Sequence, residues 1–427
     1  MRILVVGGGG REHALCWALA RSPRVSRVYC APGNAGIRAS FECAGISPDD
    51  IDGLAEWAKR EMIDLTVPGP EAPLISGIAD RFAERGLKVF GPSGKAAMIE
   101  GSKSFAKELM AKVGVPTPRF EVFDDPVRAR RHVSAVGCPV VIKADGLAAG
   151  KGVSVCFTPG EAMKAIEDAM ERRVFGAAGS RIVVEEFVRG EEATLMAVAD
   201  GDFAIPLQPA RDHKRAFDGD VGPNTGGMGA YSPIPSLDRE AVRDICRTIV
   251  RPVLAELLRR GTRYTGVIYA GLMLTDRGPV VLEFNARFGD PETQVVLPLL
   301  KTDLAGIVIA AVEGELPRCS VEWADGASVC VVMASAGYPG PCEKGKPITG
   351  LELLGGLPRV HVFHAGTAEG PRGETVTSGG RVLGVTATGE TLAEARDRAY
   401  DAVSFVRFEG AHYRRDIASD AAGRPVH

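Results

Sequence analysis

The stretch Val281-Leu-Glu-Phe-Asn-Ala-Arg-Phe-Gly-Asp-Pro-Glu-Thr-Gln294 says more about fold and chemistry than any other part of the chain. Its apolar residues favour a β-strand, on which successive side chains point to opposite faces. Glu283 and Asn285 should therefore point one way, and Leu282 and Phe284 the other. Two oxygen ligands on one face suit a hard cation such as Mg²⁺, with water and phosphate oxygens completing its coordination. Taken alone, the pattern more often marks the polar edge of an ordinary strand, so the rest of the chain must decide.

Length and composition describe an ordinary globular protein with several domains. The chain has 427 residues, 45% of them hydrophobic and 25% charged, and a net charge of −3. This length predicts about two to four domains. The charge, without a run of basic residues, argues against a nucleic-acid partner, and no apolar stretch reaches the roughly 20 residues that span a bilayer. Nine cysteines without a Cys-x-x-Cys pair indicate reduced thiols, so we expect a cytoplasmic protein with no membrane partner.

The first 90 residues alternate strand-like and helical patterns, which predicts a parallel α/β sheet. Glycines 7–10 follow the first apolar run, where backbone N–H groups at a helix N-terminus would bind an anion. The dinucleotide fingerprint is not matched, because Glu12 stands where glycine or alanine is needed for close packing. A nicotinamide-dependent dehydrogenase is therefore only an alternative. The predicted strands are 3–6, 25–30, 65–67 and 87–90, and the first predicted helix covers 12–20.

Two more loops of this region follow predicted strands. Residues 32–36 contain Asn34, and residues 68–73 contain Glu71. In a doubly wound sheet such loops lie at the carboxyl ends of the strands and line the ligand crevice. Composition alone fits ordinary turns equally well.

A glycine-rich loop at 144–152 lies between predicted strands at 139–143 and 153–157. Such a loop can fold over phosphates and bind them through its backbone N–H groups. Lys143 before the loop and Lys151 within it would add positive charge. The loop is not a Walker A motif, since it lacks Gly-Lys-Ser/Thr and no helix follows it.

A third polar segment follows the predicted strand at 181–188. A strand that ends in an exposed linker leaves free backbone donors and acceptors, which a flat heteroaromatic such as adenine can use. Glu192 could then reach a ribose diol. Paired glutamates at such a place are more often just a solvated face.

The remaining segments define boundaries and a loop of unusual composition. Residues 211–233 are too rich in glycine and proline for regular structure, and long irregular loops in compact proteins are usually functional or disordered. We expect a substrate loop there. The region past about 328 has no dense cluster of catalytic residue types and is interpreted as a packing domain. The other predicted features are a boundary at 91–94, helices at 102–112 and 392–403, and strands at 327–333 and 381–386.

Together these motifs resemble the ATP-grasp superfamily and, within it, the glycinamide ribonucleotide synthetase (phosphoribosylamine–glycine ligase) family. The resemblance runs from residue 1 to at least residue 417. It is most specific in Gly-Pro-Asn-Thr-Gly-Gly-Met-Gly-Ala-Tyr-Ser-Pro, residues 222–233, and Arg-Phe-Gly-Asp-Pro-Glu-Thr, residues 287–293. The other matching segments are 8–14, 32–36, 69–74, 143–153 and 283–286.

The resemblance implies a mixed fold, α/β and α+β, in three domains. An N-terminal parallel α/β sheet domain would cover 1–101. A bilobed ATP-grasp core would cover 102–328, with a lid subdomain at about 119–189. A C-terminal α+β domain, 329–427, would pack on the core. ATP would bind between the two lobes.

The resemblance also implies contacts to ATP and to a metal ion. Lys103 and Lys143 resemble the phosphate-contacting lysines, and Glu283 and Asn285 resemble ligands of Mg²⁺ or Mn²⁺. The preceding strand, 266–274, lacks the third acidic ligand of many relatives, which leaves the number of metal ions open. The other implied nucleotide contacts are the lid residues Gly146, Gly150, Lys151 and Gly152, the adenine-reading residues Glu185, Glu186, Phe187 and Val188, and Glu192 at the ribose.

The implied reaction joins glycine to 5-phosphoribosylamine in purine biosynthesis, with ATP giving ADP and phosphate through glycyl phosphate. Lys143, Arg287 and Asp290 would serve the chemistry, and Asp212 or Asp290 would hold the glycine ammonium. The other implied substrate contacts are Gly9 and Gly10 at the phosphate, Glu71 at the ribose, and Asn34, Lys214, Asn224, Thr225 and Gly226.

The alternatives are another ATP-grasp carboxylate–amine ligase or carboxylase and, from a different class, the NAD-dependent dehydrogenase. No serine or cysteine nucleophile is needed for the implied reaction. His13 and His213 are better explained by packing or hydrogen bonding than by acid–base work. We expect a monomer or a weak homo-oligomer.

Overall fold

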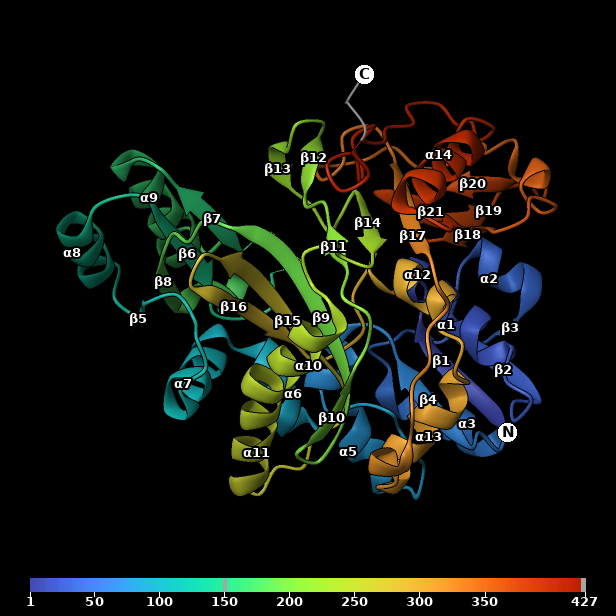
Figure 1. The fold of residues 1–427 in the computed structure, drawn as a ribbon, viewed down its shortest axis with the longest axis horizontal. Coiled ribbons are helices and arrows are strands. Elements are labelled where there is room, and N and C mark those ends of the chain that lie inside the picture. The colour runs from blue at the N-terminus through green and yellow to red at the C-terminus, as the bar shows by residue number, and fades with distance from the viewer. Residues whose placement is uncertain (149–151, 424–427) are drawn as a thin grey trace.

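The computed structural model describes residues 1–148 and 152–423, and its N-terminal part contains the predicted parallel sheet (Figure 1). The strands there are β1 (Arg2–Gly7), β2 (Arg27–Pro32), β3 (Glu42–Cys43) and β4 (Leu65–Pro68), and the helices are α1 (Gly10–Ala20), α2 (Ala35–Ser40), α3 (Ile51–Arg60), α4 (Glu71–Ile75) and α5 (Ile78–Ala83). The strand order is β3-β2-β1-β4. The apolar residues of β1 are buried, as expected for a parallel sheet covered on both faces.

One predicted strand of this region is wrong. Residues 87–90 make only an isolated parallel bridge, between Val89 and Thr66. The chain then turns away at Gly91-Pro92, and proline has no N–H group with which to extend the ladder.

A small lobe follows, and Figure 1 shows it projecting away from the rest of the molecule. It consists of β5 (Phe120–Phe123), β6 (Val140–Ala144), β7 (Val153–Cys156) and β8 (Ile182–Glu186), with α8 (Pro126–Val136) and α9 (Pro159–Ile166). Its antiparallel sheet has the order β5-β8-β6-β7. Phe123, Ile142, Ile166 and Val184 belong to a hydrophobic cluster made only of residues from this lobe.

The large lobe contains the strand with Glu283 and Asn285. Its antiparallel sheet has the order β10-β9-β15-β16, from β9 (Glu191–Asp200), β10 (Phe203–Pro206), β15 (Thr265–Thr275) and β16 (Gly278–Asn285), and its helices are α7 (Lys103–Val113), α10 (Arg239–Ile245), α11 (Arg251–Arg259), α12 (Thr293–Val296) and α13 (Leu304–Glu313). The helix α6 (Gly94–Gly101) precedes them and packs on α4 of the N-terminal part. The predicted alternation along β16 is partly wrong. The register shifts between Gly271 and Leu272, which pair with Glu283 and Val281, so Leu282 is the extra residue of a bulge. Leu282 consequently lines the cleft together with Glu283, and Val281 is buried in the core instead.

The sheet of the C-terminal region also contains two strands, β11 and β14, from the middle of the chain. The order is β11-β14-β17-β21-β18, from β11 (Arg211–Asp212), β14 (Gly229–Ser232), β17 (Ala327–Ala334), β18 (Val360–His364) and β21 (Arg381–Gly389), covered by α14 (Leu392–Val403). Two short hairpins, β12 (Arg215–Phe217) with β13 (Val221–Asn224) and β19 (Thr367–Glu369) with β20 (Thr375–Thr377), complete the described strands.

The prediction that 211–233 lacks regular structure is therefore wrong in part. Pairing with β17 satisfies the backbone of β14, so the glycine-rich sequence extends an existing sheet. Gly222 at φ +87° accommodates the conformation required in the β12–β13 hairpin.

The N-terminal part of the chain contacts the C-terminal region, since α1 packs against β18. No helix in the described part of the chain is long and apolar enough to cross a membrane. Short 3₁₀ or π-helical turns lie at Glu167–Glu171, Gly176–Ser180, Cys246–Val250, Leu297–Leu299, Leu316–Arg318 and Leu351–Leu353.

Candidate functional site

A cleft of about 700 Å³ lies between the small lobe and the large lobe. Most residues that the sequence assigned to a site line it, and they come from both lobes, from the β11–β14 segment and, for Glu71, from α4 of the N-terminal part. The predicted residues that line the cleft are Glu71, Lys103, Lys143, Gly146, Gly152, Glu185, Glu186, Phe187, Val188, Glu192, Asp212, Lys214, Asn224, Thr225, Gly226, Glu283, Asn285, Arg287 and Asp290.

Three predicted residues in the described part of the chain, Gly9, Gly10 and Asn34, are not among those lining the cleft. Gly150 and Lys151 lie outside the described residues. Gly9 donates its N–H to the carboxylate of the buried Glu12 at 2.6 Å, and Gly10 follows it at the start of α1. Asn34 donates to the carbonyls of Gly8 and His364 and accepts from the N–H of Ile37, so its side chain serves the structure.

Glu12 also explains why this glycine turn does not resemble a dinucleotide site. Its carboxylate pairs with Arg11 at 2.6 Å as well as with the N–H of Gly9. A Cβ at Gly69 would lie 1.9 Å from this carboxylate and one at Gly7 2.6 Å from the same side chain. Glu12 therefore fills the space that the fingerprint leaves to a small residue.

Lys103 and Glu283 face each other across the cleft floor at 2.7 Å. The Lys103 ammonium holds the pKa of Glu283 far below its usual range, although burial opposes the shift. Lys103 occupies the first turn of α7, whose N-cap Ser102 accepts from the N–H of Phe105. Asn285, two residues along β16, lies beside Glu283 on the cleft.

A buried triad of charges lies at the end of β8, beside the cleft. Glu185 on β8 pairs with Lys143 at 3.0 Å and with Lys107 at 3.1 Å. Burial is the main reason that the pKa of Lys107 is lowered to about 8. The other carboxylate oxygen of Glu185 has no hydrogen-bond partner within the described ranges. A buried unpartnered acceptor in a cleft wall fits a ligand donor such as an adenine amino group.

Arg287 is fixed by two carboxylates at the end of β16. Its guanidinium lies 3.2 Å from Glu71 and 3.1 Å from Glu100. Glu100 also accepts from the N–H of Ala286 at 2.7 Å. Burial would lower the pKa of Arg287, but Glu100 and Glu71 raise it above its usual value, so the charge is permanent. Sequence reasoning missed Glu100, an isolated acid on α6 whose partner lies 187 positions away along the chain.

The two candidate carboxylates for an ammonium group differ in their partners. Asp290 pairs with Arg381 at 2.7 Å and accepts from Gln294 at 2.7 Å. Burial would raise the pKa of Asp290, but Arg381 and Arg11 lower it. Asp212 forms neither an ion pair nor a side-chain hydrogen bond in the part of the chain that the structure describes. Burial raises the pKa of Asp212 to about 7.

A further hydrogen-bonded group of the cleft was missed in the sequence. Glu292 accepts from the Tyr269 hydroxyl at 2.7 Å and from Thr194 at 3.2 Å. Glu292 lies within the motif-rich stretch 281–294, which could have pointed to it. Tyr269 and Thr194 are single residues on β15 and β9 without a motif around them. The group supports the wall next to Asp212 and Lys214.

The donor set fits a hard divalent cation, with Glu283 and Asn285 as the protein oxygens. Within residues 1–148 and 152–423, no group of three or more histidine, cysteine, aspartate or glutamate residues could hold a metal ion. This agrees with the absence of an acid from β15. Phosphate and water oxygens would have to complete the coordination of any cation bound here.

Two lobes around a cleft with paired lysines and a carboxylate–amide pair define the ATP-grasp class. Residues 101–293 match the family model described as phosphoribosylglycinamide synthetase, ATP-grasp (A) domain. Residues 1–100 match the N domain of the same synthetase, and residues 328–420 match its C domain. The chain belongs to the phosphoribosylglycinamide synthetase family.

Relatives and solved structures agree with this membership. The chain is 51% identical to a phosphoribosylamine–glycine ligase of Streptomyces coelicolor over 427 residues, covering 99% of this chain and 100% of the relative. It is 50% identical to that of Caldanaerobacter subterraneus, covering 98% and 100%. The crystal structure of the Thermotoga maritima phosphoribosylamine–glycine ligase superposes with a TM-score of 0.86 at 37% identity, covering 98% and 100%.

A more distant structure shares only the fold. The biotin carboxylase domain of the Hydrogenobacter thermophilus 2-oxoglutarate carboxylase superposes with a TM-score of 0.76 at 17% identity, covering 96% of this chain and 91% of that domain. These findings confirm the predicted fold class and family resemblance.

Proposed function

We propose that this chain joins glycine to 5-phosphoribosylamine with consumption of ATP, giving glycinamide ribonucleotide, ADP and phosphate. Condensing a carboxylate with an amine in water is uphill, and a carboxylate oxygen leaves poorly. Transfer of the terminal phosphoryl group to glycine gives glycyl phosphate, from which phosphate leaves readily. The ribosylamine nitrogen then attacks the carbonyl carbon, and loss of phosphate and a proton gives the amide.

The observation that carries the proposal is the convergence of Lys103, Lys143 and Arg287 on the cleft beside Glu283 and Asn285. Phosphoryl transfer depends mostly on charge neutralisation and alignment. Lys103 and Lys143 would hold the phosphates of ATP, and Arg287 would contact the transferred group or the carboxylate that it activates. Aligned reactants can lower a barrier by roughly 7–11 kcal/mol.

Glu283 and Asn285 would hold the divalent cation, either Mg²⁺ or Mn²⁺, because oxygen ligands accept both. The cation, when bound, neutralises charge on the phosphates. The ion pair with Lys103 keeps the Glu283 carboxylate ionised, which is the form that a cation requires.

Asp212 is our choice for the glycine ammonium, in preference to Asp290. Asp290 is already paired with Arg381, whereas the carboxylate of Asp212 has no ion-pair partner among the described residues. Burial raises the pKa of Asp212 although the Lys214 ammonium opposes the shift, and a bound ammonium would stabilise the ionised carboxylate further. Lys214, Asn224, Thr225 and Gly226 would complete this end of the cleft.

For 5-phosphoribosylamine, we assign the phosphate to the turn at Gly9 and Gly10 and the ribose to the neighbourhood of Glu71. The helix N-terminus of α1 supports this choice, since it favours anions. Because Glu12 holds the N–H of Gly9, phosphate binding at that atom would require the carboxylate to move.

The proposal extends to the setting of the reaction. The nine cysteines are free, which fits the cytoplasm. We also propose that the chain is divided into three domains, with boundaries at about residues 101 and 328. We propose further that the protein is a monomer or a weak homo-oligomer. Sedimentation velocity would measure the state of association.

The direct test is ADP release with each substrate omitted in turn. We expect ADP only when glycine and 5-phosphoribosylamine are both present, and Glu283→Ala should abolish it while leaving the far-UV circular dichroism unchanged. Stimulation of ATP turnover by bicarbonate without glycine would favour the carboxylase alternative instead. Retained turnover in Glu283→Ala would remove the metal assignment alone.

A further inference from the structure

The β12–β13 hairpin lines the cleft but has little support of its own. Its strands pair at only two positions, Arg215 with Asn224 and Phe217 with Val221, and the register shifts between them. Phe217 and Val221 are exposed. An isolated two-stranded hairpin is marginally stable at best. Contacts from elsewhere must therefore hold it where its residues reach the cleft.

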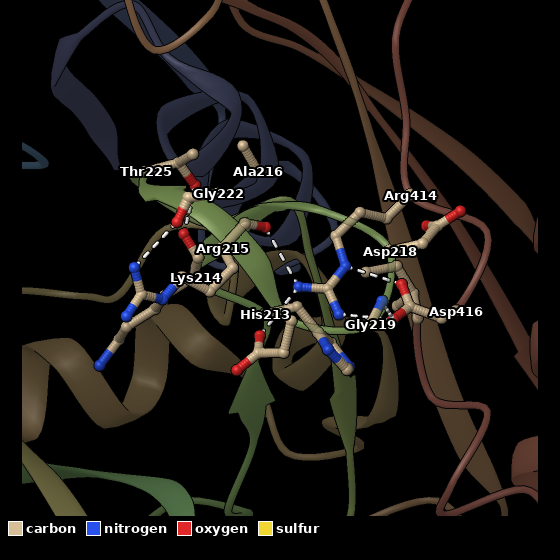
Figure 2. Close-up of polar contacts among 12 residues, drawn as sticks. His213, Lys214, Arg215, Ala216, Asp218, Gly219, Gly222, Thr225, Arg414 and Asp416 are labelled. Carbon is tan, nitrogen blue, oxygen red and sulfur yellow. Dashed lines mark hydrogen bonds and ion pairs between the residues drawn. The ribbon is translucent and has the colours of Figure 1, made fainter.

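Arg414, from the segment after α14, supplies the central contact (Figure 2). The residue is only 1% exposed, and its side chain is among the most buried large side chains described. Two of its nitrogens donate to the two carboxylate oxygens of Asp416, both at 2.7 Å. The third donates to the carbonyl of Arg215 and to the carboxylate of Asp220, both at 3.1 Å. One guanidinium thus joins its own segment to the start of β12, at Arg215, and to the turn just before β13, at Asp220.

Neighbours of Arg414 extend the same junction. Gly219 N–H donates to Asp416 at 2.9 Å, and the N–H of Arg415 donates to Asp218 at 2.7 Å. The N–H of Ala418 donates to the ring of His213 at 3.2 Å. We define residues 412–418 as the clamp segment. Figure 2 shows the clamp segment and the hairpin turned towards each other through these groups.

We propose that Arg414 is a positioning residue, which holds the β12–β13 hairpin in the conformation that completes the cleft. The hairpin brings Lys214 to within 3.2 Å of Glu192 and places Arg215 and Asn224 in the cleft wall. Arg414 does not line the cleft in the described structure, so it acts through the hairpin. Its effect on substrate binding rests on the function proposed above, whereas its effect on the hairpin does not.

A planar guanidinium is required for this role because three directions must be satisfied at once. Lysine keeps the charge next to Asp416, but its donors share one nitrogen and cannot reach all four acceptor atoms that the three guanidinium nitrogens bind. Arg414→Lys should therefore preserve the fold while releasing the hairpin. Arg414→Met also removes the positive charge beside the buried carboxylate of Asp416. Because an unpaired buried charge is destabilising, this variant should have a lower melting temperature as well.

The first measurement is limited trypsin digestion, with mass spectrometry of the cut after Lys214 or Arg215. We expect Arg414→Lys to be cut there about tenfold faster than the unmodified protein, the size that loss of a charge-assisted hydrogen bond produces. Arg398→Lys is the matched control, since Arg398 bonds Glu394 and the Thr388 carbonyl but not the hairpin. Unchanged cleavage in Arg414→Lys, or equal cleavage in the control, would overturn the proposal.

A milder variant from the hairpin side separates positioning from general destabilisation. Asp218 is exposed, and Asp218→Ala removes only its bond to the N–H of Arg415. We expect faster cleavage at the same site with an unchanged melting temperature. The Arg414→Lys enzyme should also show a KM for glycine raised about tenfold with kcat reduced less than about threefold. If glycine is not the substrate, the cleavage result still holds and only the kinetic result fails.

Discussion

At the scale of single residues, the cleft is a set of charges that are paired across long distances in sequence. Lys143, Glu283 and Arg287 could be assigned to one site because each stands at a recognisable strand end or loop. Of their partners, Glu185 and Lys103 were also predicted through the family resemblance, whereas Glu100 was not. Glu100 carries no local signal, and the bulge that turns Leu282 into the cleft depends on the register with β15.

Lys143 tests the phosphate role at this scale. Lys143→Met removes a buried charge that pairs with Glu185 at 3.0 Å, and we expect kcat/KM for ATP to fall about 100-fold because transition-state charge loses a donor. Lys112→Met is the control, since Lys112 is an exposed lysine at the end of α7. Steady-state ADP release at varied ATP measures both variants, and an unchanged ATP dependence in Lys143→Met would discard the role.

At the scale of elements, the sequence predicted the helix at 102–112 and the loop at 144–152. It did not predict that the two contact each other. Asp145, at the start of the loop, accepts from Ser102 at 2.9 Å and from the N–H of Ser104 at 3.0 Å. A carboxylate at a helix N-terminus is favourable because it meets free N–H groups and the positive end of the dipole. The strand pairing of 211–233 was also missed, since β17 lies nearly 100 residues further on.

The N-cap of α7 provides the prediction for this scale. Ser102→Ala removes the cap of the helix that carries Lys103 and the bond to Asp145, so stability should fall by about 1 kcal/mol and KM for ATP should rise. Thr391→Ala removes a comparable cap from α14, away from the cleft, and should lower stability alone. Urea unfolding and ATP kinetics on both variants separate the two effects. Equal ATP kinetics in the two would show that the cap serves only stability.

At the scale of the whole molecule, the N-terminal sheet domain and the C-terminal region are held together by contacts that no local pattern reveals. His13 on α1 accepts from the N–H of His364 on β18 at 2.9 Å, and Trp17 lies 4.6 Å from His361, ring centre to ring centre. The sequence placed His13 in a packing role, but its partner is 351 positions away. The C-terminal region is likewise more than packing, because Arg381 reaches Asp290 in the cleft.

These buried histidines predict that the junction weakens in acid. Burial lowers the pKa of His13 to about 3 and that of His364 to about 4, against an ordinary value of 6.5. Between pH 6.5 and about 4 the unfolded chain therefore binds protons that the folded chain does not. Stability is fully present above pH 6.5 and falls as the pH drops, by up to about 1.4 kcal/mol per pH unit for each histidine.

Urea unfolding at pH 7 and pH 5 measures this loss, and His13→Gln should reduce the difference between the two pH values. Glutamine can still accept from the N–H of His364 through its carbonyl oxygen, yet it binds no proton in this range. His132→Gln, in the small lobe away from this junction, is the control. If the free energy of unfolding of His13→Gln still falls as much between pH 7 and pH 5, then protonation of His13 does not cause the acid sensitivity.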